Sequence, residues 1–258
     1  MSDNIDFRST NVLVTGGSEG IGLGLAARFL AAGATVLVNG RNDAKLERAV
    51  AQHPGLKTFA GDMSVADERE RFAAYVHEVM PELTVIIHSA GAQRRVSLAE
   101  DVAPWSESQA EIDILLSAPI HLNHLLIPLI LRHRKPALVA NVTSGGAYVP
   151  QPFAPVYSAC KAALHSYTIN LRFALAGTNV KVAEIVPPAI RTALGGPGAT
   201  HGAPLDDFCD SIFAALSAGD VSEIGYGVTN GEEIQERLRI DRRLFEAFSG
   251  RFPVKKYV

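Results

Sequence analysis

The sequence predicts an α/β fold in which a mostly or wholly parallel sheet is flanked by helices. Short apolar runs alternate along the chain with stretches of helical periodicity. Some of these runs are apolar on both faces, as in Val85-Ile86-Ile87 and in residues 182–186. Such runs are typical of strands that helices cover on both sides. The chain of 258 residues is long enough for one such unit, and we expect a single domain over residues 1–258.

Strands are expected, in chain order, over residues 11–15, 35–39, 56–60, 84–88, 137–142, 180–186 and 223–227, with helices in the intervals. This alternation predicts the doubly wound Rossmann arrangement, in which ligands bind beyond the C-terminal ends of the strands. Informative residues follow each of the first six strands in turn: Gly16, Arg41, Asp62, Ala90 with Gly91, Ser144 and Pro187. We expect one crevice to collect them, with residues 1–92 mainly forming the cofactor half and residues 137–204 carrying the catalytic residues and a substrate loop.

Composition argues for a soluble globular protein, with 47% hydrophobic and 20% charged residues. A net charge of -3 gives no reason to expect nucleic acid or an anionic membrane as a partner. Residues 1–10 lack the pattern of a signal peptide, and no apolar run of membrane-spanning length is expected, so we expect a cytoplasmic location. Cys160 and Cys209 lack metal-type spacing and are expected to be plain thiols, so no metal is expected.

Tyr157 and Lys161 are four positions apart, and on a helix they share one face. A phenol is a poor acid or base at neutral pH, but a neighbouring ammonium group favours the phenolate and lowers its pKa. Ser144, at the end of a predicted strand, completes a set suited to proton transfer. Chance spacing on an exposed helix is the alternative for the pair, and a turn hydroxyl is the alternative for Ser144.

A glycine-rich turn follows the first predicted strand, with the spacing Gly-x-x-x-Gly-x-Gly over residues 16–22. Glycines at these positions permit a tight turn and close approach of a phosphate, and the helix N-terminus that follows offers unpaired N–H groups. A dinucleotide pyrophosphate is the expected ligand. Residues 16–20 also spell the Gly-x-Ser-x-Gly turn of hydrolases, but on a first strand no upstream segment remains for an oxyanion loop.

Taken together, Thr15-Gly16-Gly17-Ser18-Glu19-Gly20-Ile21-Gly22, Ser144 and Tyr157-x-x-x-Lys161 resemble the classical short-chain dehydrogenase/reductase family over nearly the whole chain. Residues 154–168 and Pro187-Pro188-Ala189-Ile190 further resemble the branch labelled lipoteichoic-acid D-alanine esterification oxidoreductases. That label describes a genetic neighbourhood, so only the general chemistry is taken from it.

The resemblance implies roles for the catalytic set. Tyr157 would be the general acid in reduction and the general base in oxidation, with its pKa lowered by Lys161 and by a positively charged nicotinamide ring. Lys161 would also bind the nicotinamide ribose, and Ser144 would hold the substrate oxygen. Further cofactor contacts are implied at Gly16, Ser18, Glu19, Ile21, Asp62, Met63, Ser89, Ala90, Gly91, Pro187, Ile190 and Thr192.

Cofactor preference depends on the end of the second strand, where enzymes that use NAD usually carry an acid for the adenosine 2′-hydroxyl. Gly40 occupies that position, and Arg41 after it can pair with a 2′-phosphate. The sequence therefore predicts NADP(H), with a solvated arginine at a helix start as the alternative.

Two residues depart from the family pattern. His88-Ser89 stands where the family usually has two asparagines, and His88 is expected to be either a hydrogen-bonding core residue or a chemical group. Leu115 stands at the position of the family's catalytic asparagine, which helps to place a water that links the lysine to solvent. Ser117 or His88 could offer another proton route.

Other features have two interpretations. Residues 189–204 are expected to be either a substrate-covering loop or a plain surface loop. Arg94-Arg95 could receive an anionic substrate or be solvated, and His121 and His124 are read as helix-face histidines. The apolar helix over 154–176 predicts a homodimer or homotetramer.

The sequence thus favours an NADP(H)-dependent oxidoreductase that interconverts a carbonyl and a secondary alcohol on a small molecule. The alternative is an NADP-binding sensor or scaffold with reduced or lost catalysis, which His88 and Leu115 suggest. Retention of Ser144, Tyr157 and Lys161 argues against that alternative, because a pure binder has no need of the serine.

Overall fold

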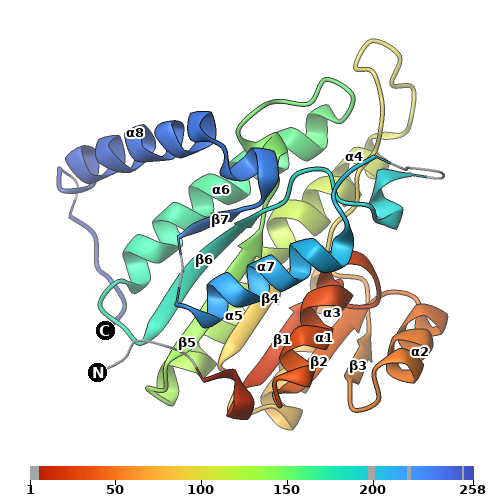
Figure 1. The fold of residues 1–258 in the computed structure, drawn as a ribbon, viewed down its shortest axis with the longest axis vertical. Coiled ribbons are helices and arrows are strands. Elements are labelled where there is room, and N and C mark those ends of the chain that lie inside the picture. Colours follow the sequence, from red (N-terminus) through yellow and green to blue (C-terminus); the bar gives the residue numbers. More distant parts are fainter. Residues whose placement is uncertain (1–5, 197–200, 220–221, 252) are drawn as a thin grey trace.

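The computed structural model describes residues 6–196, 201–219, 222–251 and 253–258. Within them, seven parallel strands form one sheet in the order β3-β2-β1-β4-β5-β6-β7 (Figure 1). The strands are β1 (Asn11–Thr15), β2 (Thr35–Gly40), β3 (Lys57–Ala60), β4 (Val85–His88), β5 (Ala137–Val142), β6 (Val180–Val186) and β7 (Glu223–Gly225). The predicted doubly wound parallel fold is confirmed, and the ends of the strands differ from the predicted ends by at most two residues.

Helices connect the strands: α1 (Gly20–Ala31), α2 (Asp43–Gln52), α3 (Ala66–Val79), α4 (Trp105–Ile112), α5 (Ala118–Arg132), α6 (Pro155–Leu175), α7 (Leu205–Ser217) and α8 (Glu232–Ser249). A π-helical turn, η2 (Asp113–Ser117), joins α4 to α5. Short 3₁₀ turns are η1 (Phe7–Ser9), η3 (Gly145–Ala147), η4 (Ala193–Gly195) and η5 (Gly227–Asn230).

Alternation along each strand divides the core into two layers. Val12 and Val14 of β1 are buried in one apolar cluster with residues of α1, α2 and α7, whereas Leu13 is buried in another with residues of α3, α5 and α6. The same division recurs in β2 and β4, because successive side chains of a strand point to opposite faces. Figure 1 shows α1 and α7 packed side by side over the first of these faces.

The continuous helical stretch Trp105–Arg132 is long and apolar enough to cross a membrane by length and composition. The expectation that no run reaches this length is therefore wrong. Half of its most apolar window is buried within the protein, and Leu122, Leu126 and Ile130 pack in the second core layer. A core helix of a soluble protein meets the same criteria, and the buried residues of this stretch pack with those of the sheet.

The chain changes direction in the sheet between β1 and β4. From β1 it proceeds outward through β2 to β3, and then β4 pairs on the other side of β1. At such a switch point the connections on either side diverge and leave a crevice at the C-terminal strand ends. The residues predicted to be functional follow the strands at this edge.

Candidate active site

The glycine turn after β1 has a backbone that requires glycine at two positions. Gly16 and Gly20 have φ angles of +66° and +58°, in the left-handed region that other residues rarely adopt. A Cβ on Gly16 would lie 2.6 Å from the Cα of Ala90, and one on Gly22 would lie 2.3 Å from the carbonyl oxygen of Gly16. The turn is thus packed tightly against the residues that follow β4.

The start of α1 has no side-chain cap. Glu19 is the N-cap residue, but its carboxylate pairs with Lys45. The first-turn N–H groups of α1 are therefore not satisfied by the capping side chain and can receive an anion. Together with the tight glycine turn, this uncapped helix end fits the pyrophosphate of a dinucleotide.

At the end of β2 a side chain in place of Gly40 would crowd Ser18. A Cβ on Gly40 would lie 2.9 Å from the Cβ and Oγ of Ser18. Arg41, whose side chain is 76% exposed, lies with its Nη1 3.9 Å from Oδ2 of Asp62. The acid that usually binds the ribose hydroxyls is therefore absent from this position, and an exposed guanidinium stands beside it.

Asp62 and Met63 lie at the same end of the site as Arg41. Oδ1 of Asp62 accepts hydrogen bonds from the N–H and hydroxyl of Ser64, at 2.9 and 2.8 Å. Met63 is buried, and its carbonyl oxygen accepts from Nη1 of Arg69 at 2.7 Å. The Met63 carbonyl is thus already engaged within the protein.

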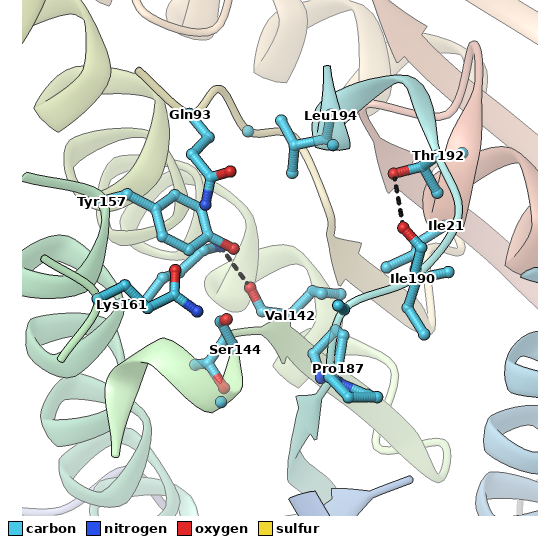
Figure 2. A pocket seen from close by; sticks show the side chains of 18 of the residues that line it. Ile21, Gln93, Val142, Ser144, Tyr157, Lys161, Pro187, Ile190, Thr192 and Leu194 are labelled. Carbon is cyan, nitrogen blue, oxygen red and sulfur yellow. Dashed lines mark hydrogen bonds between the residues drawn. The ribbon is translucent and has the colours of Figure 1, made fainter. Parts of the chain in front are cut away.

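The three residues of the predicted catalytic set meet at the other end. Ser144 follows β5, while Tyr157 and Lys161 lie on α6, and all three are buried (Figure 2). The Lys161 ammonium donates to the carbonyl oxygen of Val142 at 2.7 Å and lies 5.6 Å from the centre of the Tyr157 ring. The hydroxyl of Ser144 accepts from the N–H of Gly146 at 3.0 Å. The order and spacing read from the sequence thus produce a compact cluster at the sheet edge.

Burial dominates the protonation of this cluster. It raises the pKa of Tyr157; a hydrogen bond to Ser144 opposes the rise, and the charge of Glu111 adds to it. Burial also lowers the pKa of Lys161 to about 8, although the nearby Cys160 and Glu184 oppose that effect. In the protein by itself the pKa of Tyr157 is therefore raised, because the ammonium donates to the Val142 carbonyl and desolvation of the phenol prevails. The lowering by Lys161 together with a bound nicotinamide ring stays a prediction.

A single cavity of about 750 Å³ joins the two ends. Eleven of the predicted site residues line it: Glu19, Ile21, Arg41, Ser89, Gly91, Ser144, Tyr157, Lys161, Pro187, Ile190 and Thr192. The others stand just behind or beside this lining: Gly16, Ser18, Asp62, Met63 and Ala90. Of the predicted substrate loop, Ile190 bridges to Ala203, while residues 197–200 lie outside the described residues.

The structure also explains the two departures from the family pattern. Leu115 lies in the π-helical turn and packs in one apolar cluster with Tyr157 and Cys160. His88 is buried with Nε2 2.9 Å from Oδ1 of Asn123, and burial lowers its pKa to about 4. His88 is therefore a neutral core residue, as one of the two interpretations held.

The alternative proton route through Ser117 has no support in the structure. Its hydroxyl donates to Asp113 at 3.0 Å, and neither Ser117 nor His88 lines the cavity. His121, the other histidine of interest, takes a hydrogen bond from Arg69 at 3.1 Å. No group of three or more His, Cys, Asp or Glu side chains suited to a metal occurs among the described residues.

A buried network beneath the site was missed at the sequence level. The carboxylate of Glu184 in β6 is fully buried and accepts hydrogen bonds from the hydroxyls of Thr143 and Tyr148, at 2.6 and 2.9 Å. Its other oxygen lies 2.7 Å from Nδ1 of His165, one turn after Lys161 on α6. The signal was available, because a glutamate within an apolar strand requires buried partners.

The network has a titratable member. Burial lowers the pKa of His165, but the hydrogen bond and charge of Glu184 outweigh it, so the pKa is raised above the ordinary value of 6.5. The same burial and the Glu184 charge raise the pKa of Tyr148, so its hydroxyl stays protonated and donates. Protonated His165 and Glu184 thus form a buried ion pair.

The arrangement defines a class of protein before any comparison: a doubly wound α/β protein in which one cavity joins a glycine turn after the first strand to a buried serine, tyrosine and lysine after the fifth. Comparisons with known proteins identify the family. The family described as short chain dehydrogenase matches residues 10–200, and the chain belongs to it.

Relatives agree with this assignment. The uncharacterized oxidoreductase DltE of Bacillus subtilis is 38% identical over 186 residues, which cover 72% of this chain and 73% of that protein. Sulfoacetaldehyde reductase 2 of Chromohalobacter salexigens is 28% identical over 223 residues, or 83% of this chain and 85% of that protein. A short-chain dehydrogenase from Burkholderia cenocepacia, solved in complex with NADP, superposes with a TM-score of 0.78 at 25% identity, covering 94% of this chain and 98% of that one.

The His165–Glu184 pair predicts a pH-dependent stability. Because the pKa of His165 is raised in the folded state, protonation stabilises the fold below about pH 6.5, and this contribution is lost as pH rises through the folded-state pKa. We expect His165→Gln to lower the free energy of unfolding more at about pH 6 than at about pH 9, as measured by urea unfolding. His124→Gln, at an exposed histidine of α5, should show no such difference. An equal loss at both pH values would contradict the ion pair.

Proposed function

We propose that this chain is an NADP(H)-dependent oxidoreductase that interconverts a carbonyl and a secondary alcohol on a small molecule. The observation that carries the proposal is the placement of Ser144, Tyr157 and Lys161 in the same cavity as the glycine turn. The cavity volume of about 750 Å³ is large enough for the nicotinamide end of a dinucleotide and a small substrate together, since ligand pockets commonly have volumes of about 300 to 1,000 Å³.

The cofactor end of the cavity would bind a dinucleotide through several parts of the chain. The glycine turn and the uncapped start of α1 would bind the pyrophosphate, and Asp62 would bind the adenine. Ile190 and Thr192, whose hydroxyl lies 3.5 Å from the Ile190 carbonyl, would contact the carboxamide. When bound, the nicotinamide supplies or accepts the hydride.

The proton is handled by the protein. Tyr157 would donate it to the carbonyl oxygen that Ser144 holds and polarises, and Lys161 would bind the ribose hydroxyls. Because the pKa of Tyr157 is raised, the phenol is protonated at neutral pH. A protonated phenol is the form that the general acid needs in the reduction direction of the proposed reaction.

Preference for NADP(H) is supported by Gly40 and Arg41. Ser18 leaves no room at position 40 for the side chain that favours NAD, and the exposed Arg41 guanidinium can form paired charge-assisted bonds to a 2′-phosphate. The Burkholderia cenocepacia relative in complex with NADP is consistent with this preference.

Replacing Tyr157 tests the reaction. Tyr157→Phe removes the transferable proton and keeps the ring, so we expect turnover to fall by about 10²- to 10⁴-fold while cofactor affinity changes little. Turnover is measured with a panel of ketones and alcohols and both cofactors, by absorbance of the reduced nicotinamide. Tyr75→Phe is the matched control, because Tyr75 is partly buried and packs against Phe59 outside the cavity. Retained turnover in Tyr157→Phe would exclude Tyr157 as the acid, and an unmutated protein that binds cofactor but turns over no substrate would favour the sensor or scaffold.

Replacing Arg41 tests the cofactor. One charged hydrogen bond to phosphate contributes about 1.5 to 3 kcal/mol, so Arg41→Ala should remove most of the preference for NADPH over NADH. Calorimetric titration with NADPH and with NADH measures this preference. Arg48→Ala, at an exposed arginine of α2 outside the cavity, should leave the preference unchanged. Equal affinity of the unmutated protein for NADPH and NADH would refute the assignment.

We also propose a homodimer or homotetramer with α6 in one interface. The exposed positions of this helix carry small side chains, Ala159, Ala162, Ser166 and Asn170, which permit another helix to approach closely. Light scattering at micromolar concentration should give a multiple of the chain mass, and Ala162→Arg should dissociate the assembly whereas Ala51→Arg on α2 should not. A monomeric unmutated protein would contradict this proposal.

A further inference from the structure

The two consecutive arginines after β4 have different environments. The Arg94 guanidinium is 19% exposed and lies 2.9 Å from Asp101, 3.2 Å from Glu107 and 2.8 Å from the hydroxyl of Ser108. Its charge is therefore used within the protein, to fasten this loop to α4 and the turn before it. Arg95 is exposed, has no ion pair among the described residues, and lines the cavity.

Arg95 is held between two fixed backbone positions. The N–H of Arg94 donates to Oε1 of Glu111 at 2.9 Å, and the N–H of Val96 donates to the carbonyl oxygen of Phe153 at 3.0 Å. The guanidinium of Arg95 lies 5.1 Å from the centre of the Phe153 ring. Phe153 precedes α6 by two residues, so these contacts place Arg95 beside the segment that leads into Tyr157.

The direction of neighbouring side chains agrees with this placement. Gln93 and Arg95 both line the cavity, whereas Arg94 turns to α4. This alternation is that of extended backbone, in which residues i and i+2 share a side. Figure 2 shows Gln93 pointing toward Tyr157. Arg95 therefore belongs to the substrate end of the cavity.

At the substrate end of the cavity, no lining carboxylate among the described residues balances the positive side chains. The single carboxylate that lines the described cavity, Glu19, is at the cofactor end and is paired with Lys45. Lys161 donates to the Val142 carbonyl and Arg41 lies near Asp62. Arg95 is thus the arginine that faces the substrate end with no carboxylate of the protein to neutralise it.

We propose that Arg95 binds an anionic group of the substrate, so that the substrate class is a small carbonyl compound with a carboxylate or sulfonate near the reacting carbon. A guanidinium can bind such a group through two parallel hydrogen bonds, and the cation–π contact with Phe153 helps to hold it beside the cavity. This inference rests on the proposed function, since it names the substrate class of the same site.

The test compares acids with their neutral esters. The unmutated protein, Arg95→Gln, Arg95→Lys and Arg48→Gln are assayed with NADPH and with 2-, 3- and 4-oxo acids of four or five carbons and their methyl esters. Arg48 is an exposed arginine of α2 outside the cavity lining and controls for net charge. Arg95→Gln should lower kcat/KM for the acids by about 10- to 100-fold, mainly through KM, and change it for the esters by less than about threefold. Arg95→Lys should keep part of the preference for acids over esters, and Arg48→Gln should keep all of it.

A binding measurement separates this inference from the proposed function. The NADPH-loaded protein is titrated by calorimetry with succinate, which cannot be reduced, and with dimethyl succinate. We expect succinate to bind more tightly than its ester, and Arg95→Gln to abolish the difference. If the esters are reduced as well as the acids and Arg95→Gln changes neither, the inference fails while the proposed function stands. If nothing is reduced, the proposed function fails, and the Arg95 dependence of succinate binding still decides whether the anion site exists.

Discussion

The hydrogen bonds of the buried Glu184 carboxylate are the interactions on which the geometry of the Ser144, Tyr157 and Lys161 cluster depends. Its two oxygens bind Thr143, Tyr148 and His165, which come from the end of β5, the residue after η3 and the middle of α6. Ser144 follows Thr143 in sequence, and Lys161 lies one turn before His165. The same carboxylate therefore fixes the strand end that carries the serine and the helix that carries the tyrosine and lysine. A buried carboxylate is tolerated only when its oxygens are satisfied, so the network is constrained as one unit.

The cofactor end depends on a different constraint, the close approach of backbones at the switch point. Thr15 accepts hydrogen bonds from the N–H groups of Ser89 and Ala90, at 3.1 and 3.2 Å, and Gly16 packs directly against Ala90. Side chains are excluded here by sterics, and the helix N-terminus and backbone groups remain available to an anion. One end of the cavity thus depends on the absence of side chains and the other on a buried charged network.

Much of this could be read from the sequence, and the exceptions have physical causes. Strands buried on both faces carry a continuous apolar pattern, so the parallel sheet was predictable. The meeting of Ser144, Tyr157 and Lys161 in one cavity was also predictable, because Tyr157 and Lys161 share a helix face and Ser144 follows a strand at the same sheet edge. The pKa direction of Tyr157 was not predictable, because it depends on how far the phenol is desolvated and on what Lys161 binds, and both are set by packing.

The different roles of Arg94 and Arg95 were also not predictable, since they depend on Asp101, Glu107 and Phe153 being brought to one loop by the fold. The long apolar helix was misjudged because Trp105–Arg132 is continuous only through a π-helical turn.

Leu115 connects this turn to the proposed chemistry. With Cys160 it forms an apolar wall against Tyr157, where the family pattern places an asparagine that holds water. A dry wall disfavours the phenolate, and burial is indeed the largest cause of the raised pKa of Tyr157. The substitution thus acts in the same direction as the proposed role, because a phenol that keeps its proton at neutral pH is a better donor than acceptor. Tyr157, Ser144 and Gln93 all line the cavity, so in the proposed reduction we expect Tyr157 to regain its proton from that side. Leu115 is therefore compatible with a working reductase. It is weaker evidence for lost catalysis than its departure from the family pattern suggests.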